Sequence, residues 1–272
     1  MRTLVHLSDL HFGAIAPATL EPLKACVEGI DPDVLVVSGD LTQRARSRQF
    51  RAARDFLAQL PHPQVVVPGN HDVPLYDVLQ RFFTPLRRYR RNFSRVIEPE
   101  YADAELVVVG VNTARSSVFK GGRINEEQVA RVQRVFAGAP ETAVRVVVTH
   151  HPLHVPDDWD EENQEAGRSR MALESLAAAG ADVYLSGHLH RTHSGGLELD
   201  IEAPVAGPLV VAAGTATSTR SRTETNRFNV LRIARETIRV EAFEWKSGES
   251  RFACEHAQEF RRMGDGWRKA AR

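Results

Sequence analysis

Runs of β-branched and other apolar residues recur along the chain and predict buried strands. They lie at 3–8, 33–38, 64–68, 105–112, 144–150, 181–187 and 208–214. Between these runs, apolar residues return at helical spacing in the segments 50–60 and 125–138, and Asn125 stands where a helix N-cap is expected. Such an alternation of strands and helices predicts an α/β layered fold.

The pattern changes towards the C-terminus. Residues 229–245 alternate between apolar and polar as antiparallel strands do, so we expect a second sheet packed on the first. For the tail, 246–272, we expect a poorly anchored helix or extension. The predicted domain therefore spans 1–245 and is followed by a C-terminal extension.

The composition is typical of a soluble globular protein, with 42% hydrophobic and 26% charged residues among 272. No apolar run approaches the roughly 20 residues that span a bilayer, and the first strand meets His6 and Asp9 too early for a signal peptide. Cys26 and Cys254 lie far apart, which argues against a disulfide framework. We therefore expect a cytoplasmic protein without a transmembrane segment.

Five of the predicted strands are followed directly by side chains that can bind a metal. These residues are Asp9 and His11, Asp40, Asn70 and His71, His150 and His151, and His188 and His190. In an open α/β sheet the strand ends converge on one crevice, where ligands bind. Asp9 and His11 are separated by one residue, so in an extended backbone both side chains would point to the same side. The series predicts a metal site.

The residue types narrow the kind of metal site. Oxygen and imidazole ligands without a thiolate exclude a structural cysteine zinc site and suit a catalytic manganese, iron or zinc ion. There are more ligands than one ion can use, whereas two ions about 3.5–4 Å apart, bridged by one carboxylate, would clamp an in-line attack on phosphorus. Gly39, Gly69 and Gly187 each precede a candidate ligand, and we expect them to free the backbone for a sharp turn.

The motifs SDLH, SGDLT, PGNHD, VVVTHHP and SGHLH occur in this order along the chain. Together they closely resemble those of the calcineurin-like metallophosphoesterases, and the resemblance covers Thr3 to about Glu244. Within that superfamily the chain is most similar to the bacterial class III cyclic nucleotide phosphodiesterases, through FKGGRINEEQ at 119–128 and AAGTATSTR at 212–220. The resemblance implies a four-layer αββα sandwich of two mixed β-sheets flanked by helices.

The resemblance also implies two metal ions, with manganese or iron as first choice and zinc as an alternative. One ion would be held by Asp9, His11, Asp40 and His190, and the other by Asp40, Asn70, His150 and His188, with Asp40 bridging. A hydroxide bridging the ions would be the nucleophile. In the stretch THHP the family's ligand is the first histidine, which leaves His151 behind a ligand or in contact with the substrate.

By the same resemblance, His71 donates a proton to the leaving alkoxide or stabilises it. Many relatives carry an aspartate three residues after the bridging one, able to orient this histidine, but here that position is Gln43. His71 would then be a weaker proton donor, or Asp72 would replace the missing support. For Asp72, support of the turn and direct catalysis are equal alternatives.

The segment 76–95 follows the catalytic loop and is expected to cover the site with two helices, the second capped by Thr84 and begun by Pro85. Its arginines suit phosphate oxygens, which indicates an anionic substrate. The predicted substrate contacts are Arg87, Arg91, His151 and Arg220. The alternative, that most of the arginines of this segment face solvent, stays open.

The leading hypothesis is a dinuclear-metal phosphodiesterase acting on a small phosphodiester, with 3′,5′-cyclic AMP as first candidate. A rival within the family is a UDP-diacylglucosamine-type or phospholipid hydrolase, in which 76–95 would receive an acyl chain and a headgroup. An inactive protein-binding scaffold would lack metal ligands, and here all seven are present. Stable nucleic-acid binding is not expected, because the basic residues form no long stripe. A homodimer is left open.

Overall fold

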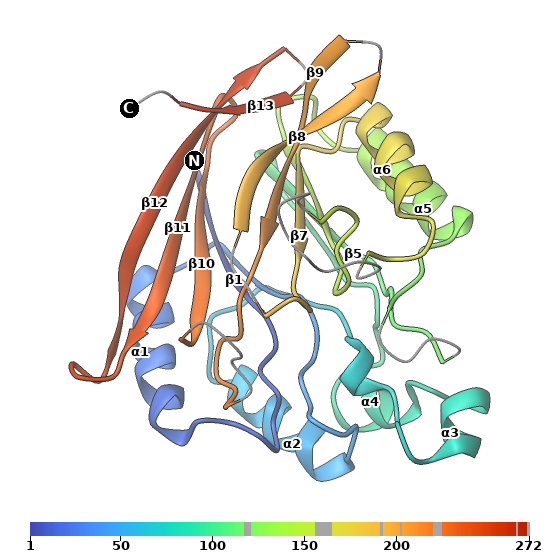
Figure 1. Ribbon diagram of the computed structural model, residues 1–272, viewed down its shortest axis with the longest axis vertical. Helices are drawn as coiled ribbons and strands as arrows, with labels where there is room; N and C mark the ends of the chain where they lie inside the picture. The colour runs from blue at the N-terminus through green and yellow to red at the C-terminus, as the bar shows by residue number, and fades with distance from the viewer. Residues whose placement is uncertain are drawn as a thin grey trace.

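The computed structural model describes residues 1–116, 121–155, 165–190, 193–201, 203–219, 225–264 and 266–270. Within these ranges two β-sheets lie face to face, and helices cover the outer face of each (Figure 1). The chain therefore forms the four-layer αββα sandwich of two mixed sheets that the sequence predicts.

The first sheet has the strand order β13-β12-β11-β10-β1-β2-β3. Its parallel part consists of β1 (Arg2–Leu7), β2 (Val34–Val37) and β3 (Gln64–Val66). Its antiparallel part consists of β10 (Arg227–Ile233), β11 (Thr237–Lys246), β12 (Arg251–Met263) and β13 (Gly266–Lys269). The antiparallel strands expected within 229–245 are thus confirmed. Their assignment to a second sheet is wrong, because β10 pairs directly with β1.

The second sheet comes from the middle of the chain and has the order β4-β5-β6-β7-β9-β8. Four strands are parallel: β5 (Leu106–Gly110), β6 (Val144–Val148), β7 (Val183–Ser186) and β9 (Ala203–Ala212). The edges are the antiparallel strands β4 (Glu100–Ala102) and β8 (His193–Ile201). All seven strands predicted from the apolar runs are present.

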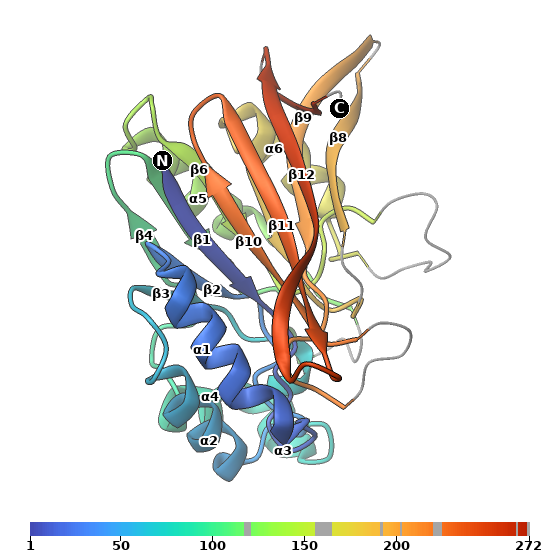
Figure 2. The same cartoon turned by 90° about the vertical axis from the view of Figure 1, so that its left-hand side faces the viewer.

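Helices cover the outer faces of the sandwich. The first sheet packs against α1 (Leu20–Ile30) and α2 (Ser47–Leu57), and the second against α5 (Glu126–Ala137) and α6 (Ser169–Ala178). Figure 2 shows the first sheet from its outer side, with α1 in front and α5 and α6 behind. The predicted N-cap Asn125 is confirmed, because its side chain accepts the amide of Gln128 at 2.8 Å. Among the described residues, none of the helices combines the length and the hydropathy of a membrane span.

The layer between the two sheets is a continuous apolar core. It contains Val34 and Val36 of β2, Val146 and Val148 of β6 and residues of their neighbours, all buried. The alternate residues of the same strands face the helices, as Leu35 does. Because both faces are buried, β2 reads as an unbroken apolar run, and β6 reads as one that only Arg145 interrupts. This is why their positions are evident in the sequence.

The C-terminal tail is part of this core, so the expectation of a poorly anchored helix or extension is wrong. Phe252 and Phe260 of β12 and Trp267 of β13 are buried. The sequence signal is weak for a physical reason. β12 exposes one face and carries charged residues there, and a register irregularity between Ala242 and Phe243 of β11 interrupts the alternation opposite it.

Substitution Trp267→Ala should lower the free energy of unfolding by about 3–5 kcal/mol, because it leaves a cavity at the edge of the central core. Urea unfolding followed by far-UV circular dichroism measures this change. The control Met263→Ala alters an exposed residue of β12, 56% exposed, and should change the same free energy by less than about 0.5 kcal/mol. Equal effects of the two substitutions would contradict the placement of β13.

The segment 76–95 forms the two helices that were predicted, α3 (Val78–Phe83) and α4 (Arg87–Asn92). The predicted start of the second helix is wrong, since Leu86 is its N-cap and Arg87 its first residue. Thr84 instead ends α3, where its amide donates to the carbonyl of Gln80 at 2.9 Å.

Candidate metal centre

The strand ends carry their polar side chains on a strained backbone. Five of the seven predicted ligands have positive φ angles: Asp9 52°, His11 50°, Asp40 52°, His188 72° and His190 56°. Residues other than glycine seldom adopt this region, each at a cost of about 1–3 kcal/mol, and such residues cluster at functional sites. The expectation of an extended segment between Asp9 and His11 is therefore wrong. Left-handed turns after the strands direct these side chains to one place.

Glycines beside the ligands act in two different ways. Gly39 has a φ of 100°, and a Cβ there would also lie 2.6 Å from Nδ1 of His150. Gly69 has a φ of −106°, which any residue adopts, but a Cβ would overlap the carboxylate of Asp40. The predicted need for a sharp turn holds for Gly39, whereas Gly69 is required because the two loops approach closely.

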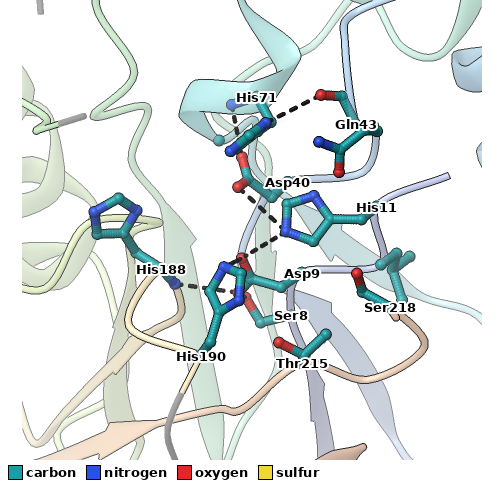
Figure 3. Close-up of polar contacts among 12 residues, drawn as sticks. Ser8, Asp9, His11, Asp40, Gln43, His71, His188, His190, Thr215 and Ser218 are labelled. Carbon is teal, nitrogen blue, oxygen red and sulfur yellow. Dashed lines mark hydrogen bonds and ion pairs between the residues drawn. The ribbon is translucent and has the colours of Figure 1, made fainter. Parts of the chain in front are cut away.

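One cluster of ligand atoms surrounds Asp9, which follows β1. Its Oδ1 lies 3.4 Å from Nε2 of His11 and 3.3 Å from Nε2 of His190. Nε2 of His11 also lies 3.7 Å from Oδ2 of Asp40, the residue that follows β2 (Figure 3). Asp9, His11 and Asp40 are fully or almost fully buried. The structure thus brings together the residues that were predicted as ligands of the first ion.

A second cluster lies on the other side of Asp40. Nε2 of His150 is 3.4 Å from Oδ1 of Asp40 and 3.0 Å from Oδ1 of Asn70, which begins the 3₁₀ turn η2 (Asn70–Asp72). The ring of His188 lies 5.1 Å from the ring of His150, between centroids. Asp40 therefore turns one carboxylate oxygen to each cluster, as a bridging ligand would.

The polar atoms of the two clusters are better arranged to bind metal ions than to form hydrogen bonds with one another. Nδ1 of His150 lies 2.8 Å from the carbonyl oxygen of Ser38 and donates its proton there, which leaves a lone pair on Nε2 facing two oxygens, those of Asp40 and Asn70. Oδ2 of Asp40 and Nε2 of His11 are buried and have no hydrogen-bond partner among the described residues. Ligands about 2 Å from a shared ion would lie about 3–3.5 Å apart. The donor set and spacing therefore suit two cations.

The charge states also favour cations. Burial raises the pKa of Asp9 and of Asp40, but the surrounding imidazoles outweigh it and bring both below the ordinary range. Burial, reinforced by the neighbouring His150, lowers the pKa of His188 to about 3. At neutral pH the centre thus offers ionised carboxylates and a neutral imidazole, the forms that bind metals.

His71 lies at the edge of the first cluster, with its ring 4.9 Å from that of His11. Its backbone amide donates to Oδ1 of Asp40 at 2.8 Å, and its Nδ1 lies 3.0 Å from the backbone carbonyl oxygen of Gln43 (Figure 3). The ring is therefore oriented by the main chain of Gln43. This contact could not be predicted from the sequence, because every residue has a main-chain carbonyl group.

The side chain of Asp72 stabilises the turn η2 through hydrogen bonds. Its buried carboxylate accepts hydrogen bonds from the amides of Leu41, Thr42 and Gly69 and from the hydroxyl of Thr42, at 2.9–3.1 Å. These bonds join η2 to the loop after Asp40. Burial and the charge of Asp40 raise the pKa of Asp72 to about 7 despite the four donors. Of the two alternatives, the contacts favour support of the turn.

Substitution Asp72→Asn should therefore act mainly on stability. The new amide group turns a donor towards donors, so the free energy of unfolding should fall by about 2–3 kcal/mol. Urea unfolding of metal-free protein measures it, since the bonds to Asp72 involve no metal. A hundredfold loss of activity with unchanged unfolding would instead support a catalytic role.

The residues predicted to contact the substrate lie in three different places. His151 lies directly behind the ligands, its ring 4.6 Å from that of His188 and its Nδ1 2.9 Å from the hydroxyl of Thr113. Arg87 and Arg91 do not join the clusters and instead line a separate cavity beside α4. Arg220 lies outside the described residues. Ser8 was missed by the sequence, and its hydroxyl donates to Asp9 at 2.6 Å.

Two clusters of carboxylate, amide and imidazole groups that share Asp40 define the centre of a dinuclear metal hydrolase. The profile of the family described as calcineurin-like phosphoesterase matches residues 2–192. The chain belongs to the calcineurin-like phosphoesterases and is a metal-dependent phosphoester hydrolase.

Two relatives are similar over most of the chain. The probable glycerophosphodiester phosphodiesterase GpdQ of Arcobacter nitrofigilis is 26% identical over 207 residues, which cover 69% of this chain and 71% of the relative. The 3′,5′-cyclic adenosine monophosphate phosphodiesterase CpdA of Escherichia coli K12 is 28% identical over 214 residues, which cover 74% of this chain and 70% of the relative.

Solved structures of more distant proteins share the fold. A dimetal phosphatase from Danio rerio superposes with a TM-score of 0.64 at 13% identity, over 89% of this chain and 95% of the other. The purple acid phosphatase PPD1 of yellow lupin superposes with a TM-score of 0.67 at 12% identity, over 93% of this chain and 52% of the other. At this identity the likeness establishes the architecture alone.

Proposed function

We propose that the protein is a phosphodiesterase that hydrolyses a small anionic phosphodiester. The observation that carries the proposal is Asp40, whose two carboxylate oxygens face two separate ligand clusters while its Oδ1 also accepts the amide of His71. With His71 as the proton donor, the proposal puts an acid beside a centre for two cations, and these contacts support it. An acid beside two cations is the set of groups that in-line displacement at phosphorus requires.

We assign the first ion to Asp9, His11, Asp40 and His190, and the second to Asp40, Asn70, His150 and His188. Two ions bound there would supply Lewis acidity and activate a water molecule for attack on phosphorus. Manganese and iron suit the mixed oxygen and imidazole donors, and zinc is the alternative. The protein's own contribution is to hold the ligands rigidly in a buried pocket, on a backbone that is already turned.

His71 is assigned as the residue that protonates the leaving oxygen. With Nδ1 bonded to the carbonyl of Gln43, the ring presents Nε2 as its second proton-carrying atom. A carbonyl orients the ring, but it stabilises the imidazolium less than a carboxylate would.

The first substrate candidate is a 3′,5′-cyclic nucleotide, because the Escherichia coli relative is a cyclic AMP phosphodiesterase. A glycerophosphodiester is the second, because the Arcobacter relative is named for that activity. Both are small phosphodiesters with an alkoxide leaving group, so both need the proton donor assigned to His71.

A substrate panel tests this proposal. Purified protein loaded with Mn²⁺ should hydrolyse bis(p-nitrophenyl) phosphate and either cyclic AMP or glycerophosphocholine, at kcat/KM at least about 100-fold above that for p-nitrophenyl phosphate. UDP-diacylglucosamine completes the panel. Preference for the monoester, or for UDP-diacylglucosamine with detergent, would replace the proposed substrate class.

A further inference from the structure

Large apolar side chains are exposed mainly on one short segment. The segment in and beside α3 contains Tyr76, 77% exposed, Val78, 60%, Leu79, 72%, Phe82, 54%, and Phe83, 79%. We call these five residues the α3 patch. Soluble monomers rarely expose contiguous apolar surface of this kind, and where it occurs it marks a binding surface.

The α3 patch is exposed although its backbone is fixed to the body of the protein. The guanidinium of Arg81 is buried and donates to two backbone carbonyls, at 2.8 and 3.0 Å. Arg88 of α4 donates to Asp77, the N-cap of α3, at 2.8 Å. Tyr89 of α4 is fully buried and donates to a carbonyl of β3. Apart from Tyr76, over whose ring the guanidinium of Arg44 lies at 5.7 Å, the attachments of this segment are thus made by residues outside the patch, which leaves the patch exposed.

Positive charge surrounds the same segment. Residues 76–95 contain six arginines and one acid, Asp77, which Arg88 already neutralises. Four of the arginines are exposed and have no ion pair or side-chain hydrogen bond with any described residue: Arg87, Arg90, Arg91 and Arg95. With Leu86, Ile97 and other described residues they line a cavity of about 860 Å³. The unpaired charge suits phosphate oxygens, and the apolar walls suit hydrocarbon.

A second copy of the chain is a poor partner for this surface. A two-fold contact would place the α3 patch on itself and bring two sets of unneutralised arginines together, where like charges repel. An anionic bilayer supplies both an apolar layer and a negative surface. We propose that α3 and α4 form a docking surface for an anionic lipid bilayer, in which the α3 patch enters the interface and the four arginines bind lipid phosphates.

The position in the fold agrees with this role. Figure 1 shows α2, α3 and α4 together at the lower end of the molecule, away from β13 at the upper end. Along the chain α3 follows η2, the turn that carries Asn70 and His71. Docking through α3 would therefore attach the protein by the segment that leads out of its metal centre.

Co-sedimentation of the full chain with vesicles tests the proposal. The protein should bind phosphatidylcholine vesicles that contain about 30% phosphatidylglycerol, should bind pure phosphatidylcholine much less, and should dissociate as salt is raised. The double variant Leu79→Ser, Phe83→Ser should weaken binding about tenfold or more. The double variant Arg87→Gln, Arg91→Gln should weaken it roughly 25-fold, at about fivefold per arginine.

Matched controls alter the far end of the molecule. Met263→Ser removes an exposed apolar residue of β12, Arg268→Gln removes an exposed charge of β13, and both should bind vesicles as the wild type does. The Leu79, Phe83 variant should keep its hydrolysis of bis(p-nitrophenyl) phosphate, which shows that it is folded. Vesicle binding requires no hydrolysis, so failure of the assigned substrate would leave this result unaffected.

Three outcomes would overturn the proposal. One is a wild type that does not bind anionic vesicles, and another is binding that both double variants retain. The third is a dimer in analytical ultracentrifugation that the Leu79, Phe83 variant converts to a monomer, which would identify a second copy as the occupant of the α3 patch.

Discussion

Substitution Asp40→Ala should reduce hydrolysis of bis(p-nitrophenyl) phosphate at least about 1,000-fold. Each of its carboxylate oxygens faces one ligand cluster, so one substitution removes a ligand from both metal sites. The imidazoles hold the pKa of Asp40 below its ordinary range even though burial raises it, so the wild-type group is a carboxylate at neutral pH. Activity and bound metal per chain, measured by elemental analysis, should fall together.

A buried aspartate elsewhere provides the control for this loss. Asp182 is 5% exposed, accepts the amide of Arg145 at 2.8 Å and pairs with Arg262 at 2.7 Å, and it directly precedes β7 in the second sheet. Asp182→Ala should lower stability but keep the metal content and kcat. Undiminished activity in Asp40→Ala would contradict the bridging assignment.

Substitution His71→Ala should reduce hydrolysis of cyclic AMP by about 10²–10⁴-fold, the usual contribution of general acid catalysis. The loss for bis(p-nitrophenyl) phosphate should be about tenfold or less, because nitrophenolate leaves without a proton. Kinetics on both substrates measure the ratio, and glycerophosphocholine replaces cyclic AMP if it is the better substrate.

Metal content separates a proton donor from a ligand. His71 lies beside Asp40 and His11, but each assigned ion keeps four other ligands, so the variant should retain its metal. The control His256→Ala alters an exposed residue of β12 and should leave the hydrolysis of both substrates unchanged. Equal losses on the two substrates would exclude the acid role of His71.

The sequence predicts the fold well, and it predicts that the candidate ligands lie together, because both depend on local signals. Strands such as β2 and β7 are buried on both faces and therefore read largely as apolar runs. The ligands follow those strands at once, so the order of the strands and the parallel topology bring them together. Asp40 stands out because it follows a strand in the middle of the parallel part of the first sheet.

What the sequence did not predict depends on backbone geometry and on distant contacts. The left-handed turns at Asp9 and His11 have no preceding glycine to signal them, because Ser8 and Leu10 stand before these candidate ligands. The support of His71 is a main-chain carbonyl. The strands of the tail became evident only through their partners, because β12 pairs with β11 along a partly exposed face.

The most direct test of the central claim is an anomalous-diffraction map from a crystal of the protein loaded with Mn²⁺. The account predicts two peaks about 3.5–4 Å apart, one on each side of the Asp40 carboxylate. The first should contact Asp9, His11 and His190, and the second Asn70, His150 and His188. A single peak, or two peaks that do not share Asp40, would contradict it.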